Sequence, residues 1–156
     1  MIRRAGAEDA GAVIALWRDC GLTRPWNDPG QDFARALAAE SAAILVAQEE
    51  GGEIMGSVML GDDGHRGWVY YLAVAPAARG IGLGRALMAE AEAWLRARGC
   101  PKIQLMVREG NGEALGFYEA LGLERQGVVT LGRFLNDQAG RHSSPSGADW
   151  SDLDPS

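Results

Sequence analysis

The chain has 156 residues, of which 47% are hydrophobic and 23% are charged, a balance typical of one globular domain rather than a disordered chain. Its formal net charge of -6 argues against a general affinity for nucleic acid or anionic membrane, since both require a basic surface. Cys20 and Cys100 have no zinc or redox spacing, and the sequence contains neither a secretory apolar segment nor a run long enough to span a membrane. We therefore expect a cytoplasmic protein with no nucleic-acid, membrane or metal partner.

Hydrophobic periodicity, punctuated by glycine and proline, divides the chain into strands and helices. Turns at 49–52 and 62–64 join three apolar runs, which predicts three antiparallel strands in a row. The helix that follows should carry the chain over to a parallel neighbour. The expected elements are strand 2–4, helix 8–20, helix 29–40, strands 43–48, 53–60 and 68–74, helix 82–98, strand 102–107, helix 111–122, and strands 123–126 and 128–134. This order, βααβββαβαββ, is typical of the α+β class.

Two segments depart from this regular pattern. The loop at 22–30, LTRPWNDPG, contains an aromatic and polar cluster of Trp26, Asn27 and Asp28 that a simple connector does not require. From residue 138 the sequence becomes rich in Ser, Pro, Gly and Asp, which is typical of a flexible tail.

The domain boundary follows from that change in composition. We predict a single domain over 1–137 and a polar tail over 138–156. Trp150 is the one residue of the tail that could dock onto a groove of this chain or of a neighbour, and a homodimer is left open.

A strand, a glycine loop and a helix follow one another between Trp68 and Gly99. The loop at 79–84 reads RGIGLG, and its glycines allow a close backbone approach where a helix begins. The free N–H groups and the dipole of such a helix end attract anions, phosphate above all. The loop lacks the Lys-Ser/Thr pair of a Walker A motif, and the antiparallel strands before it do not fit a dinucleotide-binding βαβ unit.

A second motif lies downstream of the glycine loop. The chain reads LAVAPAARGIGLG at 72–84 and NGEALGFYEALGL at 111–123, and in both stretches it resembles motifs A and B of the GNAT acetyltransferases. The sequence from residue 67 to 135 is most similar to that of the YpeA-like bacterial subgroup. The resemblance implies a GNAT fold, with a mixed, mostly antiparallel sheet, helices on both faces, and two parallel strands that splay apart to bind coenzyme A.

The resemblance also implies a set of cofactor contacts. Pantetheine would pair with the backbone of the strand before the loop, and the pyrophosphate would lie on the loop amides. The arginine side chains either bind the phosphates or are solvated charges. The implied acetyl-CoA-binding residues are Leu72, Ala73, Val74, Arg79, Gly80, Ile81, Gly82, Leu83, Gly84, Arg85, Asn111 and Tyr118.

Tyr118 is the residue that the resemblance marks for catalysis. A tyrosine keeps its proton at neutral pH and can donate it to a departing thiolate. Asn111 either contacts the pantetheine or caps its helix. The two positions at which some family members carry a glutamate base fall at Trp68 and near Met106, neither of which is a carboxylate. The base is therefore left open among a water chain, a residue such as Asp28 or Tyr70, and a substrate that arrives neutral.

These residues and the resemblance lead to one expected activity. The chain is expected to transfer an acetyl group directly from acetyl-CoA to the primary amine of a small molecule or a peptide. The expected acceptor-side residues are Trp26, Asn27, Asp28 and Tyr70, whereas the spacing of Trp17 favours core packing. Two alternatives stay open: a non-catalytic acyl-CoA binding module, and an acetyltransferase acting on protein N-termini or lysines.

Overall fold

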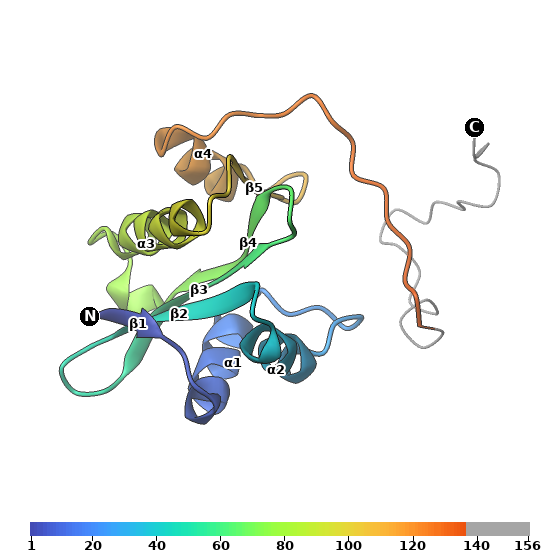
Figure 1. Ribbon diagram of the computed structural model, residues 1–156. Coiled ribbons are helices and arrows are strands. Elements are labelled where there is room, and N and C mark those ends of the chain that lie inside the picture. The colour runs from blue at the N-terminus through green and yellow to red at the C-terminus, as the bar shows by residue number, and fades with distance from the viewer. Residues whose placement is uncertain (137–156) are drawn as a thin grey trace.

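A five-stranded sheet organises the computed structural model, which describes residues 1–136 (Figure 1). The strands lie in chain order across the sheet, and every neighbouring pair is antiparallel except β4 and β5, which are parallel. The predicted tail, with Trp150, lies outside the described residues. The strands are β1 (Ile2–Arg4), β2 (Ala42–Gln48), β3 (Ile54–Asp62), β4 (Gly67–Val74) and β5 (Ile103–Leu105).

Helices cover both faces of this sheet. Figure 1 shows α1 and α2 on one face and α3 on the other. The α4 helix lies beside α3 and β5. Short 3-10 turns precede α1 and α3. The helices and turns are η1 (Ala7–Asp9), α1 (Ala10–Asp19), α2 (Pro29–Ala38), η2 (Pro76–Ala78), α3 (Leu83–Ala97) and α4 (Gly112–Ala120).

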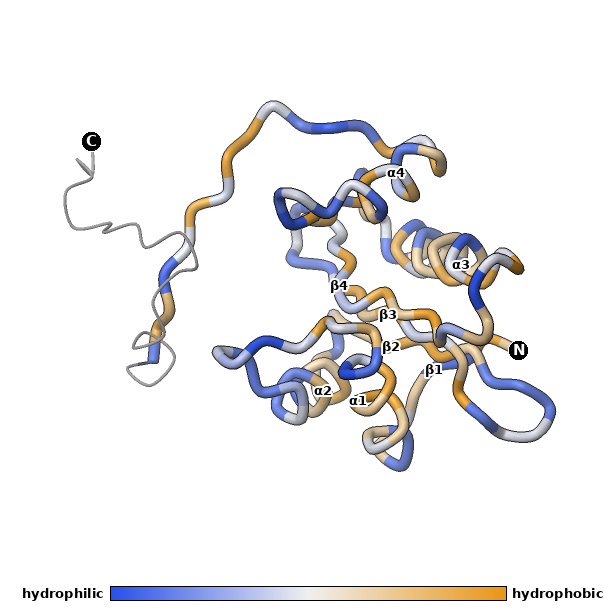
Figure 2. The backbone as a smooth tube through the Cα atoms, turned by 180° about the vertical axis from the view of Figure 1, so that it is seen from behind, coloured by the Kyte–Doolittle hydropathy of each residue, from blue (hydrophilic) through white to orange (hydrophobic). Residues whose placement is uncertain are grey.

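The β2 strand shows how two cores arise from one sheet. Side chains of a strand alternate between its faces. Ala43, Leu45 and Ala47 pack toward α3. Ile44 and Val46, which lie between them in the sequence, pack toward α1 and α2. Because both faces are covered, β2 is an uninterrupted apolar run, and the strands stand out as hydrophobic in Figure 2.

The predicted fold class is confirmed, and the structure departs from the predicted element order only at its end. The strands and helices through α4 form within a few residues of the expected bounds. The two last strands, predicted at 123–126 and 128–134, do not form, and none of these residues pairs with the sheet within the part of the chain that the structure describes. A strand needs a neighbouring edge as well as a β-like composition, and here the chain runs past β5 without joining it.

A bulge bends β4 at its centre. Between the pairs formed by Ser57 and Met59, the single residue Val58 faces two residues of β4, Tyr71 and Leu72. Tyr71 has a φ of 52°, the left-handed region that a bulky residue rarely adopts. The conformation has a cost, so neighbouring contacts must hold it in place.

Contacts with α1 and α2 hold the bulge. The Tyr71 ring stacks on Trp17 with centroids 3.9 Å apart, and its hydroxyl donates to Asp32 Oδ2 at 2.7 Å. Trp17 is fully buried, as its spacing predicts, and its Nε1 donates to Ser57 Oγ at 2.9 Å. The Ser57 hydroxyl in turn donates to the carbonyl of Tyr71 at 3.5 Å. These contacts connect the strained residue to both the opposite strand and the helices.

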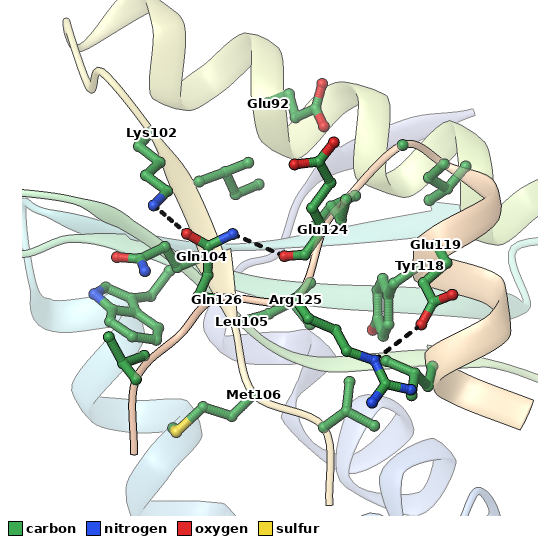
Figure 3. A pocket seen from close by; sticks show the side chains of 18 of the residues that line it. Glu92, Lys102, Gln104, Leu105, Met106, Tyr118, Glu119, Glu124, Arg125 and Gln126 are labelled. Carbon is green, nitrogen blue, oxygen red and sulfur yellow. Dashed lines mark hydrogen bonds and ion pairs between the residues drawn. The ribbon is translucent and has the colours of Figure 1, made fainter. Parts of the chain in front are cut away.

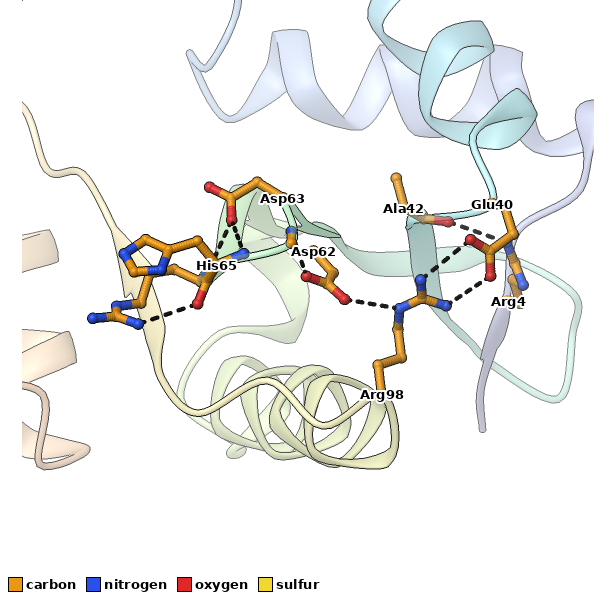
Figure 4. A network of polar contacts seen from close by, with 9 residues as sticks. Arg4, Glu40, Ala42, Asp62, Asp63, His65 and Arg98 are labelled. Atoms are coloured by element: carbon orange, nitrogen blue, oxygen red, sulfur yellow. Dashed lines mark hydrogen bonds and ion pairs between the residues drawn. The ribbon is translucent and has the colours of Figure 1, made fainter.

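Two further contacts fix α3 against the sheet. At Gly56 of β3, a Cβ atom would lie 2.9 Å from Leu87 Cδ1, so the helix approaches as closely as it does because this residue is glycine. At the other end of α3, Arg98 points between Glu40 and Asp62, with N···O distances of 3.1 and 3.4 Å (Figure 4). The first half of α3 is thereby held close to β3, and its carboxyl end is held by ion pairs to Glu40 and Asp62.

Candidate functional site

The strands β4 and β5 separate along their length and leave an open edge. They pair at only three positions, from Gly67 opposite Ile103 to Val69 opposite Leu105. Beyond them, the part of β4 from Tyr70 to Val74 has no partner on the β5 side within the described residues. The predicted splayed pair is therefore present, and Leu72, Ala73 and Val74 lie along the opened edge.

The glycine loop follows directly and ends in the first turn of α3. Gly80 and Gly82 have φ values of 83° and 85°, and Gly82 stands at the N-cap in the left-handed conformation. The backbone N–H groups from Gly80 to Arg85 have no acceptor among the described residues. A Cβ atom at either left-handed glycine would meet nothing within 4 Å, and Ile81 between them is 77% exposed. The loop presents a row of free donors to open space at the positive end of a helix.

Arg79 is held by the end of β4 through its Nε. That atom donates to the carbonyl of Val74 at 3.1 Å, while Nη2 lies 3.8 Å from Cys20 Sγ. The Cys20 thiol donates to the same carbonyl at 3.4 Å. Arg79 therefore has a structural contact that the sequence does not show, beside the two roles predicted for the arginines, phosphate binding and a solvated charge. Arg85 is exposed on the first turn of α3.

Gly84 ties the loop to α4. A Cβ atom at this position would lie 3.2 Å from Phe117 Cζ, so the aromatic ring packs directly on the glycine. Leu83 is partly buried and packs on the α3 side of the core. The glycine at the end of the motif therefore permits a helix contact, while the two before it supply the left-handed turns.

Tyr118 stands next to Phe117 on α4. The two rings meet edge to face with centroids 5.1 Å apart. Burial raises the pKa of the Tyr118 phenol, and the hydroxyl has no hydrogen-bond partner among the described residues. The side chain lines a groove together with Leu105 and Met106 (Figure 3). Tyr118 is thus a protonated donor beside β5, one residue away from the contact with the loop.

Two predicted site residues serve as helix caps. Asn111 Oδ1 accepts from the N–H of Ala114 at 3.1 Å, and Asp28 Oδ1 accepts from Gly30 and Gln31 at 2.9 and 3.2 Å. Of the two alternatives for Asn111, the structure supplies the cap. Asp28 is exposed and its capping oxygen stabilises the start of α2, so any role toward substrate falls to its other oxygen.

The loop at 22–30 reaches the segment that follows β5. The Arg108 guanidinium carbon lies 5.6 Å from the centre of the Trp26 ring, a cation–π contact between the first third of the chain and the segment that joins β5 to α4. Asn27 is exposed beside it. Arg108 was not singled out from the sequence, although its place just beyond the carboxyl end of a parallel strand is a signal that could have found it.

The far end of β4 carries a second aromatic group. Tyr70 is 43% exposed and stacks on Trp68 with centroids 6.4 Å apart. Burial, with a further effect from Asp63, raises the pKa of Tyr70. Trp68 Nε1 donates to Asp63 Oδ2 at 3.0 Å. Trp68 and Met106, at the positions where some family members carry a glutamate base, are an indole and a thioether. Within residues 1–136 no group of three potential metal ligands lies together.

Comparisons with known proteins agree with this geometry. A model of the Acetyltransferase (GNAT) family matches residues 12–123. A protein named Acetyltransferase ECA0875, from Pectobacterium atrosepticum, is 52% identical over 134 residues, which cover 86% of this chain and 94% of that protein.

Solved structures share the fold. The structure of AAC(6')-Iy in complex with the bisubstrate analogue CoA-S-monomethyl-acetylneamine has a TM-score of 0.74 at 20% identity and covers 86% of this chain and 97% of its own. A putative acetyltransferase from Pyrococcus furiosus has a TM-score of 0.67 at 26% identity, over 86% of this chain and 99% of its own.

The splayed strands, the glycine loop at a helix start and the match to the family model define one class of protein. The chain belongs to the GNAT family of acetyltransferases. In the part of the chain that the structure describes, no helix is long and apolar enough to cross a membrane.

Proposed function

We propose that the protein transfers an acetyl group from acetyl-CoA to a primary amine. The observation that carries this proposal is the row of unpartnered N–H groups from Gly80 to Arg85, placed where β4 loses its parallel neighbour. A helix start of this kind binds a pyrophosphate, and an open strand edge binds an amide chain. A coenzyme A ester contains both groups in sequence. We also assign the chain to the YpeA-like subgroup, because its sequence from residue 67 to 135 resembles that subgroup.

The residues present fit such a cofactor. Gly80 and Gly82 leave open space where side chains would block the approach of a phosphate, and both hold backbone turns that other residues resist. The pyrophosphate would lie on their N–H groups, and the pantetheine amides would pair with the edge at Leu72 and Val74. Acetyl-CoA supplies the activated thioester and a thiolate leaving group.

Tyr118 is the proton donor of this proposal. Its raised pKa keeps the Oη proton in place at neutral pH, and no group among the described residues takes that hydrogen bond. A free, protonated phenol can donate to a sulfur that gains negative charge. Phe117 positions Tyr118, because the Phe117 ring packs on Gly84 and fixes α4 relative to the loop.

The acceptor amine is proposed to lie on the side of α1 and α2. Trp26 and Asn27 belong to the loop that meets Arg108, and Asp28 starts the helix behind it. Tyr70 offers an exposed phenol on β4. An aromatic and carboxylate wall of this kind suits a cation, which is how an amine arrives at neutral pH. The AAC(6')-Iy neighbour was solved with an aminoglycoside-type analogue, which supports a small-molecule amine over a protein.

One observation favours a second candidate. Trp68 and Met106 stand where some family members carry a base, and the carboxylate that Trp68 contacts, Asp63, already accepts three hydrogen bonds. A protein of this fold without a base could bind an acyl-CoA without turning it over. The same fold could also act on a protein N-terminus or a lysine.

A panel of amines, including aminoglycosides, polyamines, amino acids and short peptides, separates these candidates. CoA release and acetylated product are measured by chromatography and mass spectrometry, because the thiols of Cys20 and Cys100 would interfere with a thiol reagent. We expect turnover with at least one small amine. Turnover only with peptides would identify a protein-modifying enzyme, and silence across the panel despite acetyl-CoA binding would identify a binding module.

On the best substrate, Tyr118→Phe tests the proton donor. The variant keeps the aromatic ring and loses only the hydroxyl, so we expect kcat to fall by about 10²-fold while acetyl-CoA affinity stays within about twofold of the original. Unchanged kcat would remove Tyr118 from the mechanism. A parallel loss of affinity would instead show that the hydroxyl holds the cofactor.

A further inference from the structure

The bulge in β4 turns two successive tyrosines toward the face of the sheet that α1 and α2 cover. Tyr70 pairs with Met59, and residues directly opposite each other in an antiparallel sheet share a face. Met59 and Tyr71 both pack against the core on the α1 and α2 side, whereas Leu72 packs on the α3 side. Regular alternation after Tyr70 would have turned Tyr71 toward α3. The bulge therefore brings the Tyr71 side chain to the side of the sheet proposed for the acceptor.

The Tyr71 hydroxyl engages one of the two carboxylate oxygens of Asp32 on α2. It donates to Oδ2 at 2.7 Å, and Oδ1 accepts no hydrogen bond from the described residues. Burial, with further effects from this hydrogen bond and from the charge of Asp32, raises the pKa of Tyr71, so the phenol stays a donor at neutral pH. Asp32 itself is only partly buried. The bond to Tyr71 thus orients the carboxylate and leaves its second oxygen available to a ligand.

The negative charge of Asp32 has no cationic partner in the part of the chain that the structure describes. No arginine or lysine of residues 1–136 forms an ion pair with it, and this includes the exposed Arg35 on the next turn of α2. Both side chains line a shallow hollow of about 500 Å³. The other lining residues are the alanines Ala36, Ala38, Ala39 and Ala42. A carboxylate that is partly removed from water and not neutralised by the protein attracts a cation.

Asp32 belongs to the same wall as the residues predicted to contact the acceptor. It lies in the first turn of α2, the helix that Asp28 caps, and the loop before that helix carries Trp26 and Asn27. The helix dipole stabilises an ionised carboxylate at this position. Because acids are common in the first turn of any helix, the sequence does not mark Asp32 for a role in binding. Its contact with Tyr71, 39 positions away, is visible only in the structure.

We propose that Asp32 Oδ1 binds an ammonium group of the acceptor. This inference rests on the proposed acetyl transfer and assigns the carboxylate on its acceptor side. A primary amine is a cation at neutral pH, and its N–H groups form strong, charge-assisted hydrogen bonds with a carboxylate. Tyr71 links Asp32 to the bulge, where the edge of β4 opens. The substrate class is a cationic amine whose compact aliphatic part fits the alanine-lined hollow.

Steady-state kinetics on the best substrate of the amine panel test this assignment. Asp32→Asn removes the charge and keeps the shape, so we expect KM for the amine to rise about 10–100-fold, the usual effect of losing a hydrogen bond to a charged group. Since the cofactor site is on the other side of the sheet, kcat should change by less than about threefold and the acetyl-CoA melting shift should be retained. Asp32→Glu restores the charge and should recover a large part of the lost affinity for the amine.

Tyr71→Phe is the matched control for a merely structural role. It breaks the same hydrogen bond and keeps the carboxylate, so it should lower stability as Asp32→Asn does, yet raise KM for the amine by less than about threefold. Glu50→Gln, in the exposed turn between β2 and β3, controls for the loss of one negative charge and should leave KM unchanged.

The outcomes separate this assignment from the activity on which it rests. Turnover by the wild type with an unchanged KM in Asp32→Asn would overturn the role of Asp32 and leave the acetyl transfer standing. An equal rise of KM in Tyr71→Phe and Asp32→Asn would show that the contact only supports the fold, and would overturn it as well. A wild type that is silent across the whole panel would refute the proposed transfer, and the assignment of Asp32 with it.

Discussion

Gly82→Glu tests whether the glycine loop holds the cofactor. Gly82 has a φ of 85° at the N-cap of α3, and the N–H groups around it are free. A glutamate would place its carboxylate against the site proposed for the pyrophosphate, in the region where the helix dipole favours a negative charge. The carboxylate would occupy the donors and repel the phosphates.

The chain offers a matched control for the backbone strain. Gly64, in the turn between β3 and β4, has a φ of 86°, and like Gly82 it has open space where a Cβ atom would lie. A side chain in the left-handed region costs about 1–2 kcal/mol, so Gly64→Glu and Gly82→Glu should lose similar amounts of unfolding free energy. Their melting temperatures without ligand should both fall by roughly 2–8 °C. Only the variant in the loop should also lose the cofactor.

Thermal melting with and without acetyl-CoA separates these two effects. At a hundredfold excess over Kd, a ligand adds about 2.7 kcal/mol of stability, or roughly 5–11 °C for a chain of this size. We expect that shift in the wild type and in Gly64→Glu, a smaller shift in Gly82→Ala, and none in Gly82→Glu. A full shift in Gly82→Glu would place the pyrophosphate elsewhere and refute the site.

Three further changes have defined outcomes. Asp9→Asn should lower the unfolding free energy by about 2 kcal/mol in urea at pH 7, because a hydrogen bond from Arg3 lowers the pKa of Asp9 from 3.8 to about 2. This stabilisation is present above pH 4 and is lost as the pH falls to 2, where the unfolding free energies of wild type and variant should converge. Tyr71→Phe removes the donor to Asp32 and should lower the unfolding free energy by about 1–2 kcal/mol. Since burial raises the pKa of Tyr71, the difference between wild type and variant should shrink only above about pH 10. Equal stability at pH 7 would show that the bulge is held without this bond. Arg108→Ala should raise KM for the amine about 2–5-fold through loss of the cation–π contact, with the acetyl-CoA shift unchanged, and an unchanged KM would remove this contact from the acceptor side.

Periodicity and turn chemistry predicted nearly the whole fold, because those signals are local. The hairpin at 49–52 and the long helix after the glycine loop depend on neighbours a few residues apart. The segment at 128–134 is rich in β-branched and apolar residues and yet forms no strand. Composition specifies that such a segment favours extension, whereas the edge that receives it is a property of the assembled sheet.

In the candidate site, too, the local features could be predicted from the sequence and the long-range contacts could not. The loop glycines could be predicted because each has a backbone role that shows in the sequence. The contact of Cys20 with Val74 spans 54 positions, and the left-handed Tyr71 depends on a bulge opposite Val58, so neither leaves a local signal. Asn111 fits both a cap and a ligand contact by residue type, and only the geometry of the helix start shows that the cap is made.

The α4 helix connects the glycine loop to the groove beside β5. This helix has no fully buried residue, although its composition is apolar on average, so its contacts on α3 and β5 leave much of it uncovered. Phe117 packs on Gly84 of the loop proposed to bind the cofactor, and Tyr118 lines the groove beside β5. Because the two rings are adjacent on one helix, the packing of Phe117 on the loop also fixes where Tyr118 stands.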